Sequence, residues 1–323
     1  MTNPPPTRRR FIGISAAVAG LAILPGGPSI AATHAHRWKG VAMGADAEML
    51  LYHDNPAAAE QLINACLAEV HRLERIFSLY REDSAISQLN AAGTLAHPPP
   101  ELIDLLSRAS AISDLTDGAF DITVQSLWRL YRDHFTNGGA PKGPSEMALN
   151  AAKELVDYRA VDVRPNLISF SRPGVQITLN GIAQGYITDA VSNILRQAGA
   201  TNVLVNMGEI RALGSHPNGQ PWRIGLRPDA NNPVALNDQA IATSAGDGMI
   251  FPSSETHHHL FDPRSGLSAH KWQRISVIAK NATLADALST AFYVLNDDRI
   301  RSMSAKSNVQ VLAVSQDGKP FNI

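Results

Sequence analysis

The sequence predicts an α+β fold, because short apolar strand segments alternate irregularly with amphipathic helical segments. No regular strand–helix–strand period and no internal repeat is visible, so the class is α+β or mixed α/β. Of the 323 residues, 44% are hydrophobic and 18% are charged, which is typical of a globular protein. We therefore expect mixed sheets and helices in one domain over residues 36–323, preceded by a segment outside the fold.

The first 35 residues have the pattern of an export signal. Three consecutive arginines at 8–10 precede Phe11, and an uncharged stretch at 14–24 is followed by small residues. The apolar stretch is shorter than the roughly 20 residues that a membrane-spanning helix needs. We therefore expect residues 1–35 to be a twin-arginine signal peptide and the mature protein to be periplasmic, without stable membrane insertion. A basic tail before an anchoring helix is the alternative.

The beginning of the mature chain predicts a strand and a long helix. The strand is expected at 42–52, and Asn55 followed by Pro56 is typical of a helix start. Apolar residues then recur at three- and four-residue spacing, which predicts a helix over 57–77. Cys66 lies on the apolar face of this helix, so we expect a buried thiol.

The remaining elements follow from the same patterns. A second helix is expected after the prolines at 98–100, ending before a turn at Asp117 and Gly118. The Gly- and Pro-rich residues 137–146 predict a mobile surface loop between lobes. Further along, we expect a strand at 176–179, a helix at 183–198 capped by Gly199, strands at 203–206, 210–213, 222–227, 240–244 and 275–279, a helix at 284–295, and strands at 309–314 and 320–323.

Charge and cysteine content exclude several classes of protein. There are 28 Lys and Arg against 29 Asp and Glu, a net charge of -1, and no basic stripe stands out. A nucleic-acid partner is therefore not expected. The single cysteine excludes an internal disulfide scaffold and a thiolate zinc cluster. The oligomeric state is left open.

Two segments could bind a phosphate ester and a cation. TLNGIAQGYITDA (178–190) places two glycines where a strand meets a helix, so backbone amides could approach a phosphate, although glycines also serve plain turns. In NATLADALSTAF (281–292), Asp286 and Thr290 lie four residues apart on one helix face. A carboxylate, a hydroxyl and backbone carbonyls suit Mg²⁺. The alternative is that Thr283 and Asp286 form a pair resembling a capping box.

Histidines and loop aromatics supply further candidates. In the extended segment THHHLFDPRSGL (256–267), at most His257 and His259 face one site together. A single histidine acting as a general base is more economical than a transition-metal site, and surface histidines are the alternative. Asp262 and Arg264 could simply stabilise the Asp-Pro turn. Tyr80 and Phe120, on predicted loops, could contact a flat ring, although most such aromatics belong to the core.

Together and in this order, these segments resemble the ApbE family of FAD:protein FMN transferases. The resemblance covers nearly the whole mature chain, through VAMGADAEM (41–49), RLERIFSLYREDSAISQLN, TDGAFDITV, TLNGIAQGY, VLVNMGEIRALG, AIATSAGD, HHLFDPRSG and DALSTAFYVL. It implies a single α+β domain with two lobes around an FAD cleft. It also implies Mg²⁺-dependent transfer of FMN from FAD to a Thr or Ser hydroxyl of an acceptor protein, with release of AMP. The acceptor would lie in the periplasm or its membrane.

The resemblance also implies roles for individual residues. FAD would be contacted by Met43, Tyr80, Ala119, Phe120, Asp121, Thr178 and Gln184. Mg²⁺ would be held by the backbone carbonyl of Gly181 with Asp286 and Thr290. His259 would be the base for the acceptor hydroxyl.

Several positions depart from the family pattern. The family usually has Asp, Gly and Lys where this chain has Thr178, Asn180 and Gln184, and its paired glycine is reduced to Gly208 before Glu209. A neutral amide at Gln184 donates hydrogen bonds without net charge, so we expect altered FAD contacts together with retained transfer. This pattern resembles an exported branch of the family associated with maturation of the nitrous-oxide reduction machinery.

Two other functions stay open on the sequence alone. The chain could be a non-catalytic FAD-binding or electron-transfer protein that has kept the pocket. It could also be an Mg²⁺-dependent FAD pyrophosphatase that uses water in place of the acceptor hydroxyl.

Overall fold

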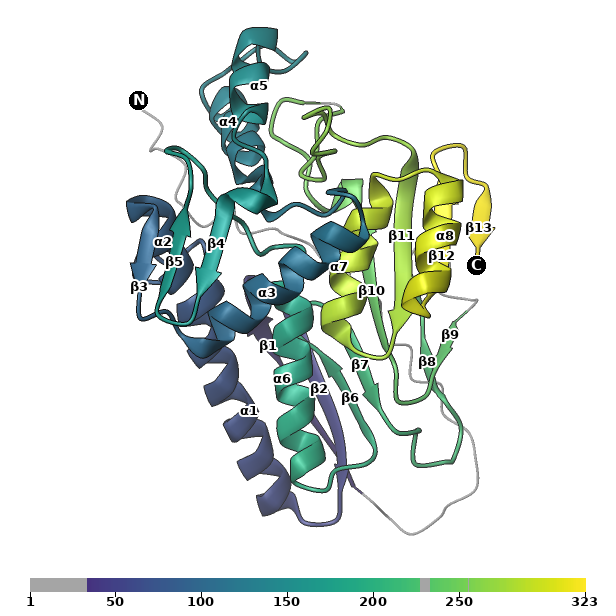
Figure 1. Ribbon diagram of the computed structural model, residues 1–323. Coiled ribbons are helices and arrows are strands. Elements are labelled where there is room, and N and C mark those ends of the chain that lie inside the picture. The colour runs from purple at the N-terminus through teal and green to yellow at the C-terminus, as the bar shows by residue number, and fades with distance from the viewer. Residues whose placement is uncertain (1–33, 227–232, 255) are drawn as a thin grey trace, which may run out of the picture.

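An antiparallel eight-stranded sheet organises the computed structural model, which describes residues 34–226, 233–254 and 256–323 (Figure 1). The strand order is β1-β2-β6-β7-β10-β11-β12-β13, and neighbouring strands are antiparallel throughout. The strands are β1 His34–Ala42, β2 Ala45–His53, β6 Val203–Asn206, β7 Ile210–Leu213, β10 Ala240–Ala245, β11 Trp272–Ala279, β12 Gln310–Ser315 and β13 Pro320–Asn322. The α+β class is confirmed.

Helices cover one face of this sheet and enclose the main hydrophobic core (Figure 1). Their bounds are α1 Pro56–Phe77, α3 Pro100–Leu115, α6 Ala183–Gln197, α7 Ala282–Tyr293 and α8 Asp297–Ser307. The start of α1 follows the prediction, because the Asn55 side chain accepts hydrogen bonds from the backbone N–H groups of Ala57 and Ala58. Cys66 is fully buried, as expected. At the end of α6, Gly199 has a φ of 83°, the left-handed conformation that favours glycine.

The opposite face of the sheet is covered by a short hairpin. Its strands are β8 Trp222–Ile224 and β9 Val234–Leu236. Trp222, Ile224 and Leu236 pack against apolar residues of the sheet such as Leu204 and Ile241. Both faces of the central strands are therefore buried, which agrees with the continuous apolar runs in the sequence.

Two smaller units flank the main sheet. One is a three-stranded sheet of β3 Thr94–Ala96, β5 Leu167–Phe170 and β4 Val161–Arg164, with α2 Ala85–Ala92 beside β3. The other is the pair α4 Gln125–Thr136 and α5 Glu146–Lys153, which packs with Phe251 and Phe261 in an aromatic cluster of its own. The loop at 137–146 joins these two helices, so the expectation that it connects two lobes was wrong.

Two further expectations, the strand at 176–179 and the boundary of the N-terminal segment, differ from the structure. Residues 176–179 form no strand, because the backbone of Ile177 is hydrogen-bonded to the Asn90 side chain and the N–H of Thr178 donates to the Ile122 carbonyl. Strand β1 begins at His34, so the last two residues of the expected signal segment belong to the sheet, opposite Tyr52 and His53. Residues 1–33 of that segment lie outside the described part of the chain. Among the described helices, none has the length and apolarity required to cross a bilayer.

Candidate active site

A cavity lies where the α4–α5 cluster meets the main core. Its lining includes six residues singled out in the sequence: Thr178, Gly181, Gln184, His259, Asp286 and Thr290. The cavity also shares Trp128 and Asn180 with a second cavity of about 250 Å³, so the two are neighbours. We call them the inner cavity and the outer cavity. Folding thus brings together sequence segments that were only separate candidates.

Asp286 is presented to the inner cavity by a close crossing of α6 and α7. Asn281 is the N-cap of α7, and the Thr283 hydroxyl donates to Asp189 on α6. The interpretation of Thr283 and Asp286 as a capping pair is therefore wrong. Asp286 Oδ2 instead accepts a hydrogen bond of 2.9 Å from the backbone N–H of Gly185, which leaves Oδ1 for the cavity.

Two glycines make this arrangement possible. A Cβ on Gly185 would lie 2.4 Å from the carbonyl oxygen of Ala282 and 2.8 Å from Cβ of Asp286. A Cβ on Gly181 would lie 2.9 Å from Oγ1 of Thr290. All three distances are shorter than real side chains show, so Gly185 lets the backbones of α6 and α7 meet, and Gly181 lets the Thr290 side chain lie against its backbone. Gly181, Asp286 and Thr290 consequently lie side by side, in the combination that the resemblance implied for Mg²⁺.

These residues are chemically suited to a hard cation. A free carboxylate oxygen of Asp286, the Thr290 hydroxyl and the adjacent Gly181 backbone are oxygen donors, which Mg²⁺ prefers. Among the described residues, no cluster of three or more His, Cys, Asp or Glu could hold a metal ion. A transition-metal site at the histidines is therefore not supported. An oxygen site would be completed by waters and by oxygens of the bound substrate.

Glu209 is a second buried carboxylate in the inner cavity, and the sequence analysis did not assign it a role. The backbone N–H of Thr243 donates to it. Burial, and then the neighbouring Asp286 carboxylate, raise the pKa of Glu209 well above its usual value. Burial likewise raises the pKa of Asp286 to about 7. An acid placed directly between two apolar strand segments was the signal that could have identified Glu209.

His259 has the geometry of a general base. Its Nδ1 lies 3.2 Å from the carbonyl oxygen of Met249. Because a carbonyl only accepts, Nδ1 carries the proton and Nε2 is left as an unprotonated base. Burial lowers the pKa of His259, which keeps the ring neutral at neutral pH. His259 lines the inner cavity together with Asp286.

The two neighbouring histidines have different surroundings. His257 packs against the rings of Tyr131 and Phe135 at centroid distances of 5.4 and 5.5 Å. His258 is buried, and its Nε2 lies 2.8 Å from the carbonyl oxygen of Ala269. His257 and His259 therefore do not share one site. In the turn that follows, Arg264 forms an ion pair with Asp262, as expected.

Gln184 places an unpaired donor in the inner cavity. It is only 6% exposed, and its Nε2 has no hydrogen-bond partner. A buried donor without a partner costs roughly 1–3 kcal/mol, so an acceptor oxygen on a ligand would be stabilised there. Thr178, by contrast, accepts a hydrogen bond from the backbone N–H of Asn180, which stabilises the turn before α6.

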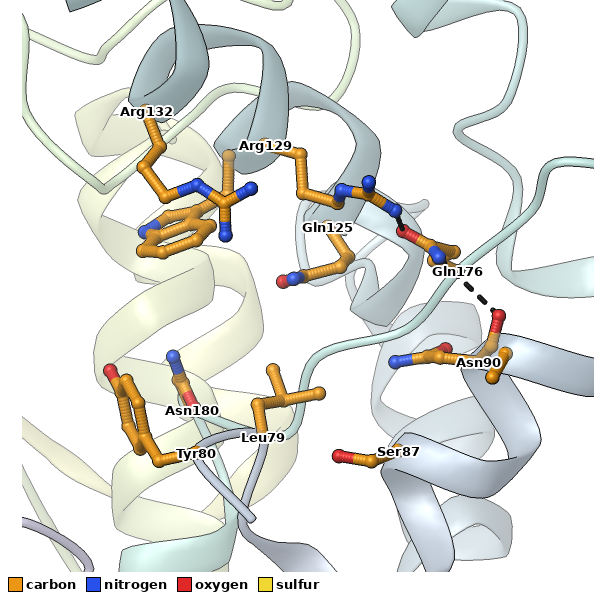
Figure 2. Close-up of a pocket in the computed structure, with 11 residues that line it drawn as sticks. Leu79, Tyr80, Ser87, Asn90, Gln125, Arg129, Arg132, Gln176 and Asn180 are labelled. Atoms are coloured by element: carbon orange, nitrogen blue, oxygen red, sulfur yellow. Dashed lines mark hydrogen bonds between the residues drawn. The ribbon is translucent and has the colours of Figure 1, made fainter. Parts of the chain in front are cut away.

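The outer cavity combines aromatic rings, amides and cations. Figure 2 shows Tyr80 and Asn180 on one side of it and Gln125, Arg129 and Arg132 on the other. The Arg132 guanidinium lies 5.0 Å from the ring centre of Trp128, and Arg129 donates to Gln176 at 2.6 Å. A flat ring with hydrogen-bonding edges would fit this lining.

Four of the expected FAD contacts line neither cavity: Met43, Ala119, Phe120 and Asp121. The Asp121 carboxylate accepts from the backbone N–H groups of Thr123 and Tyr158, so its hydrogen bonds are made within the fold. The two residues before it belong to the hydrophobic core. The backbone N–H of Met43 donates to Glu74, and Met43 adopts a φ of 50°.

The fold and these cavities define a class of protein: an α+β protein with a polar cleft that offers oxygen donors, a neutral imidazole and an aromatic recess. Comparison with known proteins shows which family within this class the chain belongs to. A model of the ApbE family matches residues 43–313, and the chain therefore belongs to the ApbE family.

Relatives with assigned names agree with this membership. The FAD:protein FMN transferase of Haemophilus influenzae is 29% identical over 264 residues, covering 76% of this chain and 75% of that protein. The FAD:protein FMN transferase of Klebsiella pneumoniae is 26% identical over 330 residues, covering 95% of this chain and 93% of the other.

Solved structures share the fold. The flavinyl transferase ApbE of Pseudomonas stutzeri, in its apo form, is 27% identical with a TM-score of 0.77, covering 91% of this chain and 97% of that one. The ApbE protein of Thermotoga maritima is 28% identical with a TM-score of 0.78, covering 90% and 97%.

Proposed function

We propose that this chain is an Mg²⁺-dependent FAD:protein FMN transferase. It moves FMN from FAD to a Thr or Ser hydroxyl of an acceptor protein and releases AMP. The observation that carries the proposal is the convergence of Asp286, Thr290 and His259 on one cavity in a member of the ApbE family. Asp286 and Thr290 would bind the cation that contacts the diphosphate of FAD. The imidazole of His259 would accept the proton of the acceptor hydroxyl.

The inner cavity is assigned to the diphosphate of FAD. Asp286, Thr290 and the carbonyl of Gly181 would hold Mg²⁺, which, when bound, neutralises charge on the diphosphate oxygens. Gln184 Nε2 would donate to a phosphate oxygen and so gain the partner that it lacks. The outer cavity, with Tyr80 and Trp128, is assigned to a ring of FAD.

The reaction at this site is a displacement at phosphorus. The acceptor hydroxyl oxygen forms a bond to the flavin-side phosphorus, and the bond from that phosphorus to the AMP oxygen breaks, so AMP leaves with the electron pair. The hydroxyl proton passes to Nε2 of His259, because Nδ1 is already bonded to Met249. A base positioned in this way is worth about 10²- to 10⁴-fold in rate.

The acceptor is proposed to be an exported or membrane-tethered protein. The support is the arginine-rich, apolar and small-residue pattern at the N-terminus, which is typical of twin-arginine signal peptides and favours a periplasmic location of the mature enzyme. Maturation of the nitrous-oxide reduction machinery is the proposed context. A fusion of residues 1–35 to a reporter tests the route, because export should stop when the arginines at 8–10 are replaced by lysines.

One mixing experiment distinguishes the proposed function from its alternatives. Purified protein is incubated with FAD, Mg²⁺ and a flavin-accepting domain, and the products are separated by chromatography. Covalent flavin on the acceptor with an equal amount of AMP supports transfer. Free FMN with AMP and no labelled acceptor would identify a pyrophosphatase, and unchanged bound FAD would identify a binding protein.

A further inference from the structure

The inner cavity contains two acidic side chains and no opposing cation. Asp286 and Glu209 both line it, and among its described lining residues none is lysine or arginine. His259 is the only other titratable residue in that lining, and its Nδ1 is bonded to the Met249 carbonyl. Two carboxylates held together in a buried cavity repel each other when both are charged, and either a bound proton or a positive charge between them relieves this repulsion.

We propose that Glu209 is a second carboxylate of the cation site, so that the protein binds a divalent cation before FAD is present. This inference rests on the proposed function, because it requires that a cation binds at Asp286. It goes further in naming Glu209 as a determinant of metal affinity. It also implies that the FAD diphosphate, itself anionic, enters a cavity whose charge the cation has already neutralised.

The backbone around Glu209 is fixed from two sides, which is typical of a built site. Glu209 lies between the end of β6 and the start of β7, and its carbonyl accepts hydrogen bonds from the backbone N–H of Met207 and the hydroxyl of Thr188. The backbone N–H of Thr243 on β10 donates to its carboxylate. Strands β7 and β10 and helix α6 thus hold the side chain in the cavity.

A second, independent observation indicates a ligand in the same cavity. Gln184 Nε2 is buried without a partner, and a Cβ on Gly208, the residue before Glu209, would lie 2.5 Å from that nitrogen. The unpaired amide donor therefore adjoins the backbone that carries Glu209. The carboxylates of Asp286 and Glu209 are suited to a cation, and the amide of Gln184 is suited to an oxygen acceptor. A metal ion that carries a bound diphosphate or water would satisfy all three groups.

The test is Mn²⁺ binding to FAD-free protein, measured by electron paramagnetic resonance and by calorimetry. Glu209→Gln keeps the shape of the side chain but removes its charge. It should raise the Kd for Mn²⁺ roughly 10- to 100-fold, the range found when residues supporting metal ligands are replaced. Asp247→Asn is the matched control, because Asp247 is an exposed acid near the site that does not line the cavity. Its Kd should stay unchanged.

A second variant keeps the inference testable if Glu209→Gln folds poorly. Gln184→Lys introduces a positive charge into the same cavity and should also weaken Mn²⁺ binding without FAD. Thermal melting checks that each variant is folded. Equal Mn²⁺ affinity in folded wild type and Glu209→Gln would overturn the inference, as would the absence of Mn²⁺ binding without FAD. Flavin transfer by the wild type in either case would leave the proposed function standing.

Discussion

In the proposed reaction the proton passes to His259, because its Nδ1 is bonded to the Met249 carbonyl and its Nε2 is left to act as the base. We predict that His259→Ala slows FMN transfer by at least about tenfold, as expected for loss of a general base. The measurement is the rate of acceptor labelling at saturating FAD and Mg²⁺. His257→Ala is the control, because His257 belongs to the aromatic cluster with Tyr131 and Phe135.

The control variant should transfer FMN at the wild-type rate per folded molecule, although its melting temperature should fall. Equal losses of rate in both histidine variants would contradict the assignment of the base.

In the proposed function, Gln184 contributes to holding the FAD diphosphate in the inner cavity. Its Nε2 is an unpaired neutral donor. Gln184→Lys should tighten FAD binding by about 1 kcal/mol, the scale that separates charge-assisted from neutral hydrogen bonds. FAD titrations with and without Mg²⁺ measure this effect, and tightening in both would support direct contact with FAD. Weaker FAD binding by the lysine variant would instead mean that Thr178, Asn180 and Gln184 form a co-adapted set.

At the scale of elements, the crossing of α6 and α7 positions the proposed metal ligands. Gly185→Ala would place a methyl group 2.4 Å from the Ala282 carbonyl oxygen and 2.8 Å from Cβ of Asp286. Because backbone must move, we predict a loss of about 1–3 kcal/mol in unfolding free energy, together with weaker metal binding. Denaturant unfolding and Mn²⁺ titration measure the two effects.

Gly199→Ala supplies the comparison for this prediction. Gly199 lies at the far end of α6, and nothing lies within 4 Å of an added Cβ. Its φ of 83° makes alanine strained, so stability should fall while metal affinity stays the same. Equal metal affinity in Gly185→Ala and wild type would show that the crossing does not position Asp286.

The elements that the sequence predicted are those with strong local patterns. The helix at 57–77 was expected at nearly its observed bounds because its apolar residues recur at regular spacing, and the strands at 203–206 and 210–213 because they are short apolar runs. Helices α2, α4, α5 and α8 were not predicted. In α8 only Ile300, Met303 and Ser304 are buried, so its apolar stripe is too narrow to stand out.

The candidate site was predictable where its geometry is local. Asp286 and Thr290 share a helix face through their spacing, whereas His259 was assigned as the base only through the resemblance to the ApbE family. Glu209 was not assigned a role, because its burial depends on β10 and on helices distant in the sequence. The hydrogen bond from Gly185 to Asp286 joins residues 101 positions apart, which no local pattern reveals.

At the scale of the whole molecule, the buried His258 links stability to pH. Burial lowers its pKa from 6.5 to about 4. The unfolded chain therefore binds a proton at higher pH than the folded chain, so stability is full above about pH 6.5 and is lost as pH falls toward 4. The loss should reach up to about 3 kcal/mol.

Urea unfolding of wild type and His258→Asn between pH 7.5 and 4.5 measures this linkage. The variant should be less stable at pH 7.5, because it loses packing against Tyr293 and the contact with Ala269. The difference between the two proteins should shrink as the pH falls. A difference that does not change with pH would contradict the linkage.

The central claim is that this fold transfers FMN to a protein hydroxyl with the help of a divalent cation at Asp286. Intact mass spectrometry of a flavin-accepting domain tests it most directly, after incubation with the enzyme and FAD in Mg²⁺ or in EDTA. We predict an acceptor carrying one FMN in Mg²⁺, no labelled acceptor in EDTA, and none with Asp286→Ala in Mg²⁺. Labelling that persists in EDTA or with Asp286→Ala, or an acceptor left unlabelled by the wild type in Mg²⁺, would contradict the claim.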